Sequence, residues 1–205
     1  PQAARQARLI AAIYAGRGRI GVGRAGTRAR DVQWLESAPE DLAGRVVLAV
    51  AARSGGSAAW IADLALLPDL ALLRLSRNSP LDLSRLPVMP HLEEVELDRL
   101  PTTRETMFAL ERQPSLSVLA LGNTSLDDEA MRALVGIARL TSLSLRDTKF
   151  AESSLPMFAS LPRLRSLHLD RAEVTDAGLA PLASLSGLEH LDLSAPGKQP
   201  AMPLE

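Results

Sequence analysis

Residues 174–193 read VTDAGLAPLASLSGLEHLDL and combine two hydrophobic rhythms in one short stretch. In the first part, Leu179, Leu182 and Leu185 are three residues apart, the spacing that places side chains on one face of a helix. The last three residues, LDL, alternate between apolar and polar, as in a strand that is buried on one side. The stretch therefore predicts a short helix followed by a short strand.

The strand half of this pattern recurs along most of the chain. The motif L-x-x-L-x-L occurs six times, once with Val in the middle, and a degenerate first copy ends at Leu48 and Val50. The middle residues of the seven copies are at positions 48, 73, 95, 119, 143, 167 and 191, so the spacings are 25, 22, 24, 24, 24 and 24. A fixed period of this length indicates one structural unit per copy. Because one unit cannot bury its apolar side alone, the copies are expected to stack into a solenoid.

The alternation within each copy predicts parallel strands whose leucines are buried and whose intervening residues point out of the core. Helices are expected on the other side of the sheet, and Leu167 is expected to be buried. The seven strands are predicted at residues 46–50, 71–75, 93–97, 117–121, 141–145, 165–169 and 189–193.

On these motifs the chain resembles the leucine-rich repeat family, and residues 174–193 look like its 24-residue bacterial form, similar to repeats in GALA-type effectors. The resemblance covers residues 45 to about 195. It implies an α/β fold, a right-handed solenoid shaped as an open horseshoe arc, with parallel strands on the concave face and helices on the convex face. It also implies a scaffold that binds another protein.

The turn after each copy departs from the usual sequence of the family. The family usually has Asn at this place, and here only Asn78 keeps it. A Thr can still form a hydrogen bond with neighbouring turn backbone, whereas Leu or Ala cannot, so turns with Leu or Ala are expected to be less regular. The residues at the equivalent places are Leu100, Thr124, Thr148 and Ala172.

The sequence predicts three parts. Residues 1–44 are expected to form an N-terminal cap, residues 45–195 the solenoid, and residues 196–205 a linker whose last two residues resemble a cloning remnant. Residues 2–15 carry apolar side chains at helical spacing and predict a capping helix. A second short helix is expected around Trp34, covering the first strand.

Residues 16–30 form a segment rich in Gly and Arg. One interpretation is a solvated loop or hairpin within the cap, and another is contact with RNA phosphates or with an acidic partner. The segment also contains Gly16-x-Gly18-x-x-Gly21, the spacing of a dinucleotide-binding loop. That loop works only between a strand and a helix of a βαβ unit, for which the chain has no room before the first solenoid strand. No cofactor is therefore expected.

Composition argues against several classes of protein. The chain has 205 residues, a formal net charge of −1 and no Cys. The charge argues against a globally basic nucleic-acid binder, and no apolar run has the ~18–20 residues of a membrane span. Without Cys there is no disulfide, Cys nucleophile or thiolate metal site. Arg outnumbers Lys by 21 to 2, which is typical of a GC-rich bacterial genome.

The side chains that alternate with the buried leucines define the candidate binding surface. Because the period is 24 residues, side chains at equal places on neighbouring strands are expected to lie side by side. The surface begins at an apolar edge, continues through an acidic strand and a saddle of small residues, and ends with His and Asp. Its candidate partner-binding residues are Leu72, Arg74, Glu94, Glu96, Asp98, Val118, Arg146, His168, Asp170, His190 and Asp192.

Three acidic residues on one strand are the most informative feature of this surface. Glu94, Glu96 and Asp98 repel one another and adjoin the small residues Ala120 and Gly122 on one side. They form either a solvated strand or the contact site for Lys or Arg of a protein partner that lies over the saddle.

A polar row on the same surface allows two further interpretations. Ser144, His168 and Asp192 take the same place on three successive strands, in the order of a hydrolase triad. Strand N–H groups are already paired in a sheet and cannot form an oxyanion hole, so we interpret the row as an exposed polar surface. The His and Asp residues at this end, which include Asp170 and His190, suit zinc by type. As diagonal neighbours on an open surface they predict no metal site. The charged residues that lie side by side are expected to form exposed cross-strand ion pairs, namely Arg74 with Glu96, Arg146 with Asp170 and Asp147 with Arg171.

The leading hypothesis is a non-enzymatic, bacterial scaffold that binds another protein, with a basic surface, through the concave face of the repeat array. An alternative is the substrate-recognition part of a larger bacterial effector, such as a ubiquitin-ligase-like protein. A third is RNA binding through the Arg/Gly segment. The chain is expected in the bacterial cytoplasm or outside the cell as a secreted effector, without membrane, cofactor or metal.

Overall fold

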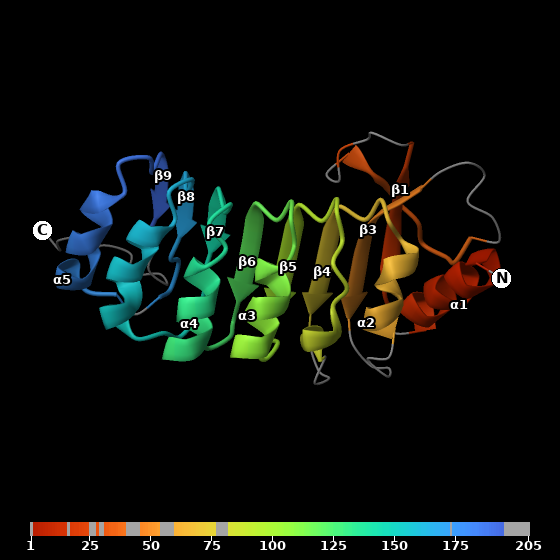
Figure 1. Cartoon of the computed structure of the whole chain (residues 1–205), viewed down its shortest axis with the longest axis horizontal. Coiled ribbons are helices and arrows are strands. Elements are labelled where there is room, and N and C mark those ends of the chain that lie inside the picture. The colour runs from red at the N-terminus through yellow and green to blue at the C-terminus, as the bar shows by residue number, and fades with distance from the viewer. Residues whose placement is uncertain are drawn as a thin grey trace, which may run out of the picture.

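The computed structural model describes residues 2–15, 17–24, 28, 31–39, 46–53, 60–76, 82–172 and 174–194. Within these residues one sheet runs along the molecule, and the chain proceeds from one end of it to the other (Figure 1). The predictions for Asn78 and for the linker at 196–205 lie outside the described residues.

The strands of the described residues form a single nine-stranded sheet. They are β1 (Arg19–Gly23), β2 (Gln33–Trp34), β3 (Val46–Arg53), β4 (Leu72–Ser76), β5 (Glu94–Asp98), β6 (Val118–Gly122), β7 (Ser142–Ser144), β8 (Ser166–His168) and β9 (His190–Asp192). Their order in the sheet is β2-β1-β3-β4-β5-β6-β7-β8-β9. From β3 to β9 neighbouring strands are parallel, and each begins within one residue of its predicted start. β1 lies in the segment interpreted as a solvated loop or hairpin, but its antiparallel partners are β2, outside that segment, and β3.

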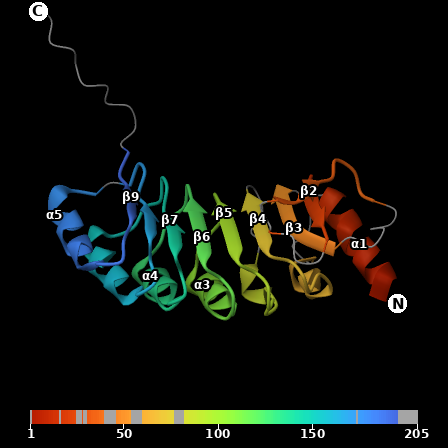
Figure 2. The same ribbon diagram turned by 90° about the horizontal axis from the view of Figure 1, so that it is seen from above.

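Short helices connect successive strands. The α-helices are α1 (Gln2–Ala15), α2 (Trp60–Asp63), α3 (Arg104–Glu111), α4 (Asp128–Val135) and α5 (Asp176–Leu179). The 3₁₀ helices are η2 (Leu64–Leu66), η3 (Leu83–Arg85), η4 (Glu152–Ser160) and η5 (Ala180–Ser184). Figure 2 shows α3, α4 and α5 along one side of the sheet, and we call the opposite side the open face. Among the described helices, none combines the length and apolar composition needed to cross a bilayer.

Local sequence explains where the helices begin and which type they adopt. At the start of α4, the Asp127 carboxylate accepts a hydrogen bond from the Ala130 N–H at 2.7 Å. Thr103 and Thr175 cap α3 and α5 in the same way. In the next layer η4 replaces an α-helix, and Pro156 inside it has no N–H to donate to an α-helical bond.

The repeated apolar residues align from strand to strand and form the core. Val95, Leu119, Leu143 and Leu167 lie in register across β5 to β8, and each is 0% exposed. The predicted burial of Leu167 is therefore confirmed. Each layer covers the apolar surface of its neighbour, as the stacking of short repeats requires.

The first copy of the repeat has a different register from the predicted one. Val50 of β3, and not Leu48, pairs with Leu73 of β4. β3 is apolar along almost its whole length, so its sequence does not specify a register. The pairing of β1 with β3 also has a shift in register next to Val47. Val47 lies in the main core, although the alternation predicted it on the open face.

The turn that follows the strands repeats one backbone conformation. Thr124 Oγ1 donates to the carbonyl of Leu100 at 2.7 Å, and Thr148 Oγ1 donates to the carbonyl of Leu121 at 2.8 Å. The expectation that Thr would bond turn backbone is confirmed. Residues with positive φ, between 51° and 57°, recur in these turns at Arg99, Asn123, Asp147 and Arg171.

The described N-terminal elements are the predicted helix α1 and the strands β1 and β2, and we call them together the cap. Trp34 lies in β2, so the prediction of a second short helix around it is wrong. Gly18 joins α1 to β1, and a Cβ there would lie 2.7 Å from the carbonyl oxygen of Ile13, so close packing requires glycine. The segment with Gly18 and Gly21 runs from a helix into a strand, the reverse of the order in a dinucleotide-binding unit.

Candidate functional site

The open face consists of the residues that alternate with the core leucines. The register confirms that equal places on neighbouring strands lie side by side. One row across β4 to β9 contains Arg74, Glu96, Ala120, Ser144, His168 and Asp192. The row before it contains Leu72, Glu94, Val118, Ser142, Ser166 and His190.

One end of this face is covered by the cap. Leu72 is 1% exposed and packs with Ala49 against Val32 and Trp34. The expectation that Leu72 contacts a partner is therefore wrong, because a cap segment from elsewhere in the chain already occupies that surface. The accessible part of the open face begins at Arg74, which is exposed.

Arg74 joins the two glutamates of the neighbouring strand β5. Its Nε lies 2.8 Å from Glu96 Oε2, and an outer nitrogen of its guanidinium lies 3.8 Å from Glu94 Oε1. The predicted pair of Arg74 with Glu96 is confirmed. The Glu94 side chain is only 26% exposed. This burial raises the pKa of Glu94, and the adjacent Glu96 raises it further.

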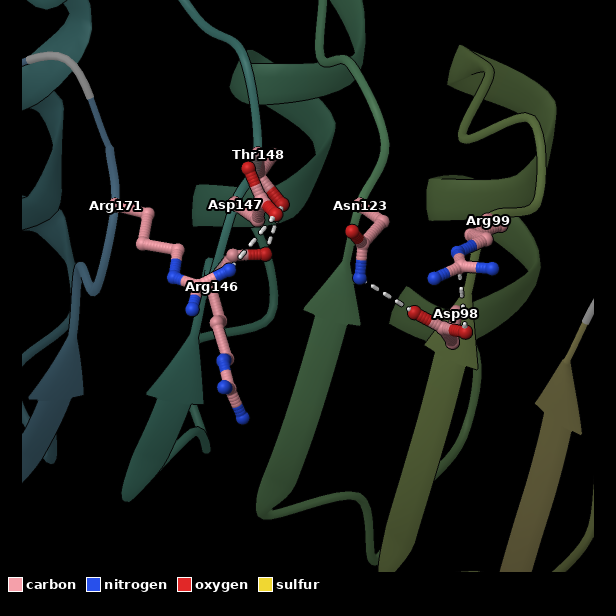
Figure 3. Close-up of polar contacts among 7 residues, drawn as sticks. All are labelled: Asp98, Arg99, Asn123, Arg146, Asp147, Thr148 and Arg171. Carbon is pink, nitrogen blue, oxygen red and sulfur yellow. Dashed lines mark hydrogen bonds and ion pairs between the residues drawn. The ribbon is translucent and has the colours of Figure 1, made fainter. Parts of the chain in front are cut away.

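Asp98, the third acidic residue of β5, is held by the turns and not by Arg74. Asn123 Nδ2 donates to Asp98 Oδ1 at 2.8 Å, and Arg99 Nε lies 3.9 Å from Asp98 Oδ2 (Figure 3). Sequence reasoning missed both Arg99 and Asn123, because it treated the positions after each strand only as turn residues. Their 24-residue spacing, which continues at Asp147, was the signal that could have found them.

The strand beside these carboxylates, β6, has small or half-buried side chains on the open face. Val118, Ala120 and Gly122 lie opposite Glu94, Glu96 and Asp98 respectively. A Cβ added at Gly122 would lie 3.1 Å from Asp98 Oδ1. Glycine at this position therefore leaves one side of the Asp98 carboxylate accessible.

The other end of the open face brings together His168, Asp170 and Asp192. Asp192 Oδ2 lies 3.9 Å from His168 Nδ1. Asp192 Oδ1 accepts hydrogen bonds from the Ser194 hydroxyl and N–H at 2.6 and 3.0 Å, and these bonds lower the pKa of Asp192. Burial raises the pKa of Asp170, and the nearby Asp192 raises it further. His190 is exposed beside them.

Two predicted ion pairs in this region have different outcomes. Arg171 and Asp147 form a pair at 3.9 Å (Figure 3). Among the ion pairs of the described residues, none joins Arg146 to Asp170. Arg146 is exposed, so its guanidinium remains accessible on the open face.

The polar row lacks the arrangement of a hydrolase triad. Ser144, His168 and Asp192 lie on adjacent strands, yet within the described part of the chain no hydrogen bond joins Ser144 to His168. The Leu145 N–H donates to the carbonyl of His168, and the Leu169 N–H to that of Asp192, both at 2.8 Å. Amides paired in this way do not form an oxyanion hole.

The sequence offers the His and Asp side chains of this surface as candidate metal ligands, because both types suit zinc. Across the residues that the structure describes, no group of three or more His, Asp or Glu side chains is placed to hold a metal ion. The His and Asp residues of β8 and β9 therefore form a polar surface that can accept and donate hydrogen bonds.

Comparison with known proteins gives matches at the level of structure. No protein-family model matches the chain, and neither does any curated protein sequence. The internalin InlF of Listeria monocytogenes matches with 25% identity and a TM-score of 0.53, over 65% of this chain and 38% of the internalin. The internalin C2 of the same species matches with 21% identity and a TM-score of 0.40, over 91% of this chain and 92% of that protein.

The match to InlF supports the leucine-rich repeat fold that the sequence motifs indicate. The chain is α/β, with a largely parallel sheet that stays open. It spans well under half of the length of InlF.

Proposed function

We propose that this chain is a non-enzymatic scaffold that binds another protein through the open face of its sheet. The observation that carries the proposal is the position of Glu94, Glu96 and Asp98 beside a strand of small residues. Charged residues next to a flat, partly apolar surface are a common arrangement in protein recognition. The likeness to a leucine-rich repeat protein supports the same conclusion.

The geometry of β5 and β6 suggests how a partner is recognised. On one side the carboxylates adjoin Arg74, which lies close to Glu96. On the other side they adjoin Ala120 and Gly122, over which a Lys or Arg of the partner can lie while its charge reaches Glu96 and Asp98. Such a cation would lower the raised pKa of Glu94 and stabilise its charged form.

The remaining contact residues extend this site along the array. We propose that the partner also contacts the half-buried Val118 and the polar residues Arg146, His168, Asp170, His190 and Asp192. We further propose that the array is a right-handed arc of the 24-residue, GALA-like bacterial type, with the open face on its concave side. A cap at residues 1–44 and a solenoid at residues 45–195 belong to the same proposal.

The same surface could serve as the substrate-recognition part of a larger bacterial effector, inside the cell or after secretion. RNA binding through the Gly/Arg segment has less support from the structure. Arg19 lies 3.2 Å from Glu36 and 5.8 Å from the centre of the Trp34 ring, so this arginine is already engaged within the cap.

The test uses a displayed library of random peptides selected against the immobilised chain. Peptides enriched on the wild type should be rich in Lys and Arg, and their binding should weaken at high salt. The triple variant Glu94→Lys, Glu96→Lys and Asp98→Lys should lose them by more than about tenfold, because opposite charges become like charges. Its fold should persist, since none of the three side chains lies in the core.

The matched control changes three acidic residues on the helical side, namely Asp63→Lys, Glu111→Lys and Asp128→Lys. Asp127 is unsuitable because its carboxylate caps α4. The control should bind the peptides as the wild type does. If the control loses binding while the β5 variant retains it, the site is on the helical side and the proposal is wrong.

A further inference from the structure

The C-terminal edge of the sheet exposes leucines that the preceding layers bury. Leu191 and Leu193 are 42% and 41% exposed. Leu167 and Leu169, which occupy the same places one repeat earlier, are 0% and 2% exposed. β9 therefore carries leucines at the core positions of the repeat, and no described residue covers them.

In the helical half of the last layer, leucines are likewise less buried than in the layer before. Leu185 and Leu188 are partly buried, whereas Leu161 and Leu164 at the same places are 1% and 2% exposed. The opposite end of the array differs, because α1, β1 and β2 cover it (Figures 1 and 2). The unsatisfied apolar surface is thus concentrated at the β9 end.

Among the described residues, none pairs with the outer edge of β9 at Leu191. The His190 N–H donates to the carbonyl of Arg165 at 2.9 Å, and the carbonyl of Asp192 accepts from the Leu169 N–H at 2.8 Å. The backbone groups of His190 and Asp192 therefore point toward β8. Because successive strand residues direct these groups to opposite sides, the N–H and C=O of Leu191 point outward.

This edge is complementary to a second copy of itself. When two β9 strands run antiparallel about a two-fold axis at Leu191, the two Leu191 residues exchange both of their backbone hydrogen bonds. His190 of each copy then lies opposite Asp192 of the other, with both side chains on the open face. An axis at Asp192 would instead place two aspartates opposite each other. The axis at Leu191 therefore pairs groups that attract.

We propose that the chain forms a two-fold symmetric dimer through β9, in which each copy covers Leu191 and the neighbouring Leu193 of the other. Two-fold interfaces of this kind use one self-complementary patch twice. The two sheets become one, and the open faces continue across the junction. The dimer uses the edge of the sheet and not the acidic strand β5, so it can be tested apart from the binding at β5. It does engage His190 and Asp192, two of the residues that we also propose as partner contacts.

The first experiment measures mass against concentration by sedimentation or light scattering. The wild type should show a monomer–dimer equilibrium. Leu191→Asp should raise the dimer dissociation constant by at least about tenfold, because it places a charge in the interface. Val88→Asp is the matched control, since Val88 is 51% exposed and lies between β4 and β5, and it should leave the equilibrium unchanged. Circular dichroism checks that each variant is folded.

The second experiment tests the register through charge. His190→Glu should weaken the homodimer because it places a second carboxylate opposite Asp192, and Asp192→Lys should weaken it because it removes the carboxylate that His190 faces. Mixed together, the two variants should form a heterodimer, and the double variant should dimerise again. Both residues are on the surface, so none of these changes disturbs the core.

Three outcomes would overturn the proposal. One is a wild type that stays monomeric at all concentrations. Another is a dimer that responds neither to Leu191→Asp nor to the charge exchange. The third is that the full chain is monomeric whereas a variant ending at Ser194 dimerises. This result would show that residues 195–205, and not a second copy, cover β9.

Discussion

Glu94 is a carboxylate that the fold holds in an unfavourable environment. It is three-quarters buried beside Glu96, and burial raises its pKa above the usual 4.5. The folded chain therefore binds a proton at Glu94 more tightly than the unfolded chain does. The stability that this group contributes is fully present below pH 4.5 and is lost as the pH rises through the raised pKa.

Glu94→Gln should therefore raise the free energy of unfolding at neutral pH, and the gain should disappear as the pH falls below 4.5. Urea denaturation between acidic and neutral pH measures this difference. Glu93→Gln removes the same charge from an exposed neighbour and is the control. A gain for Glu94→Gln that stays constant with pH would show that removal of the charge is not its cause.

Leu167 and Leu191 occupy the same place in successive repeats but differ in burial, 0% against 42% exposed. Leu167→Ala should lower the free energy of unfolding by roughly 2–5 kcal/mol, as truncation of buried leucine does. Leu191→Ala should cost clearly less in monomeric protein, because part of the side chain already contacts water. Chemical denaturation at low protein concentration measures both, and equal costs would contradict the described packing.

At the scale of elements, the two-residue strand β2 has an effect out of proportion to its length. Trp34 and the preceding Val32 lie over Ala49 and Leu72, so the cap seals one end of the open face. Arg19 lies over the Trp34 ring and also pairs with Glu36. These contacts connect the cap to the first layers of the array.

Trp34→Ala should therefore uncover Leu72 and lower the free energy of unfolding by roughly 1–3 kcal/mol, the range for loss of a partly buried aromatic side chain. It should also increase binding of a hydrophobic dye, because apolar surface at Ala49 and Leu72 becomes accessible. Val88→Ala, at an exposed apolar position, should change neither quantity. Unchanged dye binding by Trp34→Ala would show that Trp34 does not cover Leu72 in solution.

Across the whole molecule, the sequence predicts best where its period is regular. From β4 to β9 the spacing of the leucines locates each strand and the side chains of each face. β3 is uniformly apolar, so the register of Val50 depends on its contacts with neighbouring strands and not on its own pattern. The alternation of Ile20 and Val22 in β1 is a strand signal that the surrounding Gly and Arg obscure.

The same division applies to the candidate site. Alternation places Leu72 on the correct side of the sheet, but only the folded chain shows that Trp34 covers it. Asn123 has positive φ and donates to Asp98, and repeat spacing alone reveals neither feature. The repeat pattern does not predict contacts between a repeat and a segment outside the repeats, such as that of Leu72 with Trp34.

The unequal strand lengths have a mechanical consequence. β4, β5 and β6 have five residues each, whereas β7, β8 and β9 have three. In an array whose layers contact only their neighbours, a terminal layer with short strands is the easiest to detach. A pulling force applied at the C-terminus would peel the chain one layer at a time. At the other end, the antiparallel strands β1 and β2 and the helix α1 must detach before the array can open.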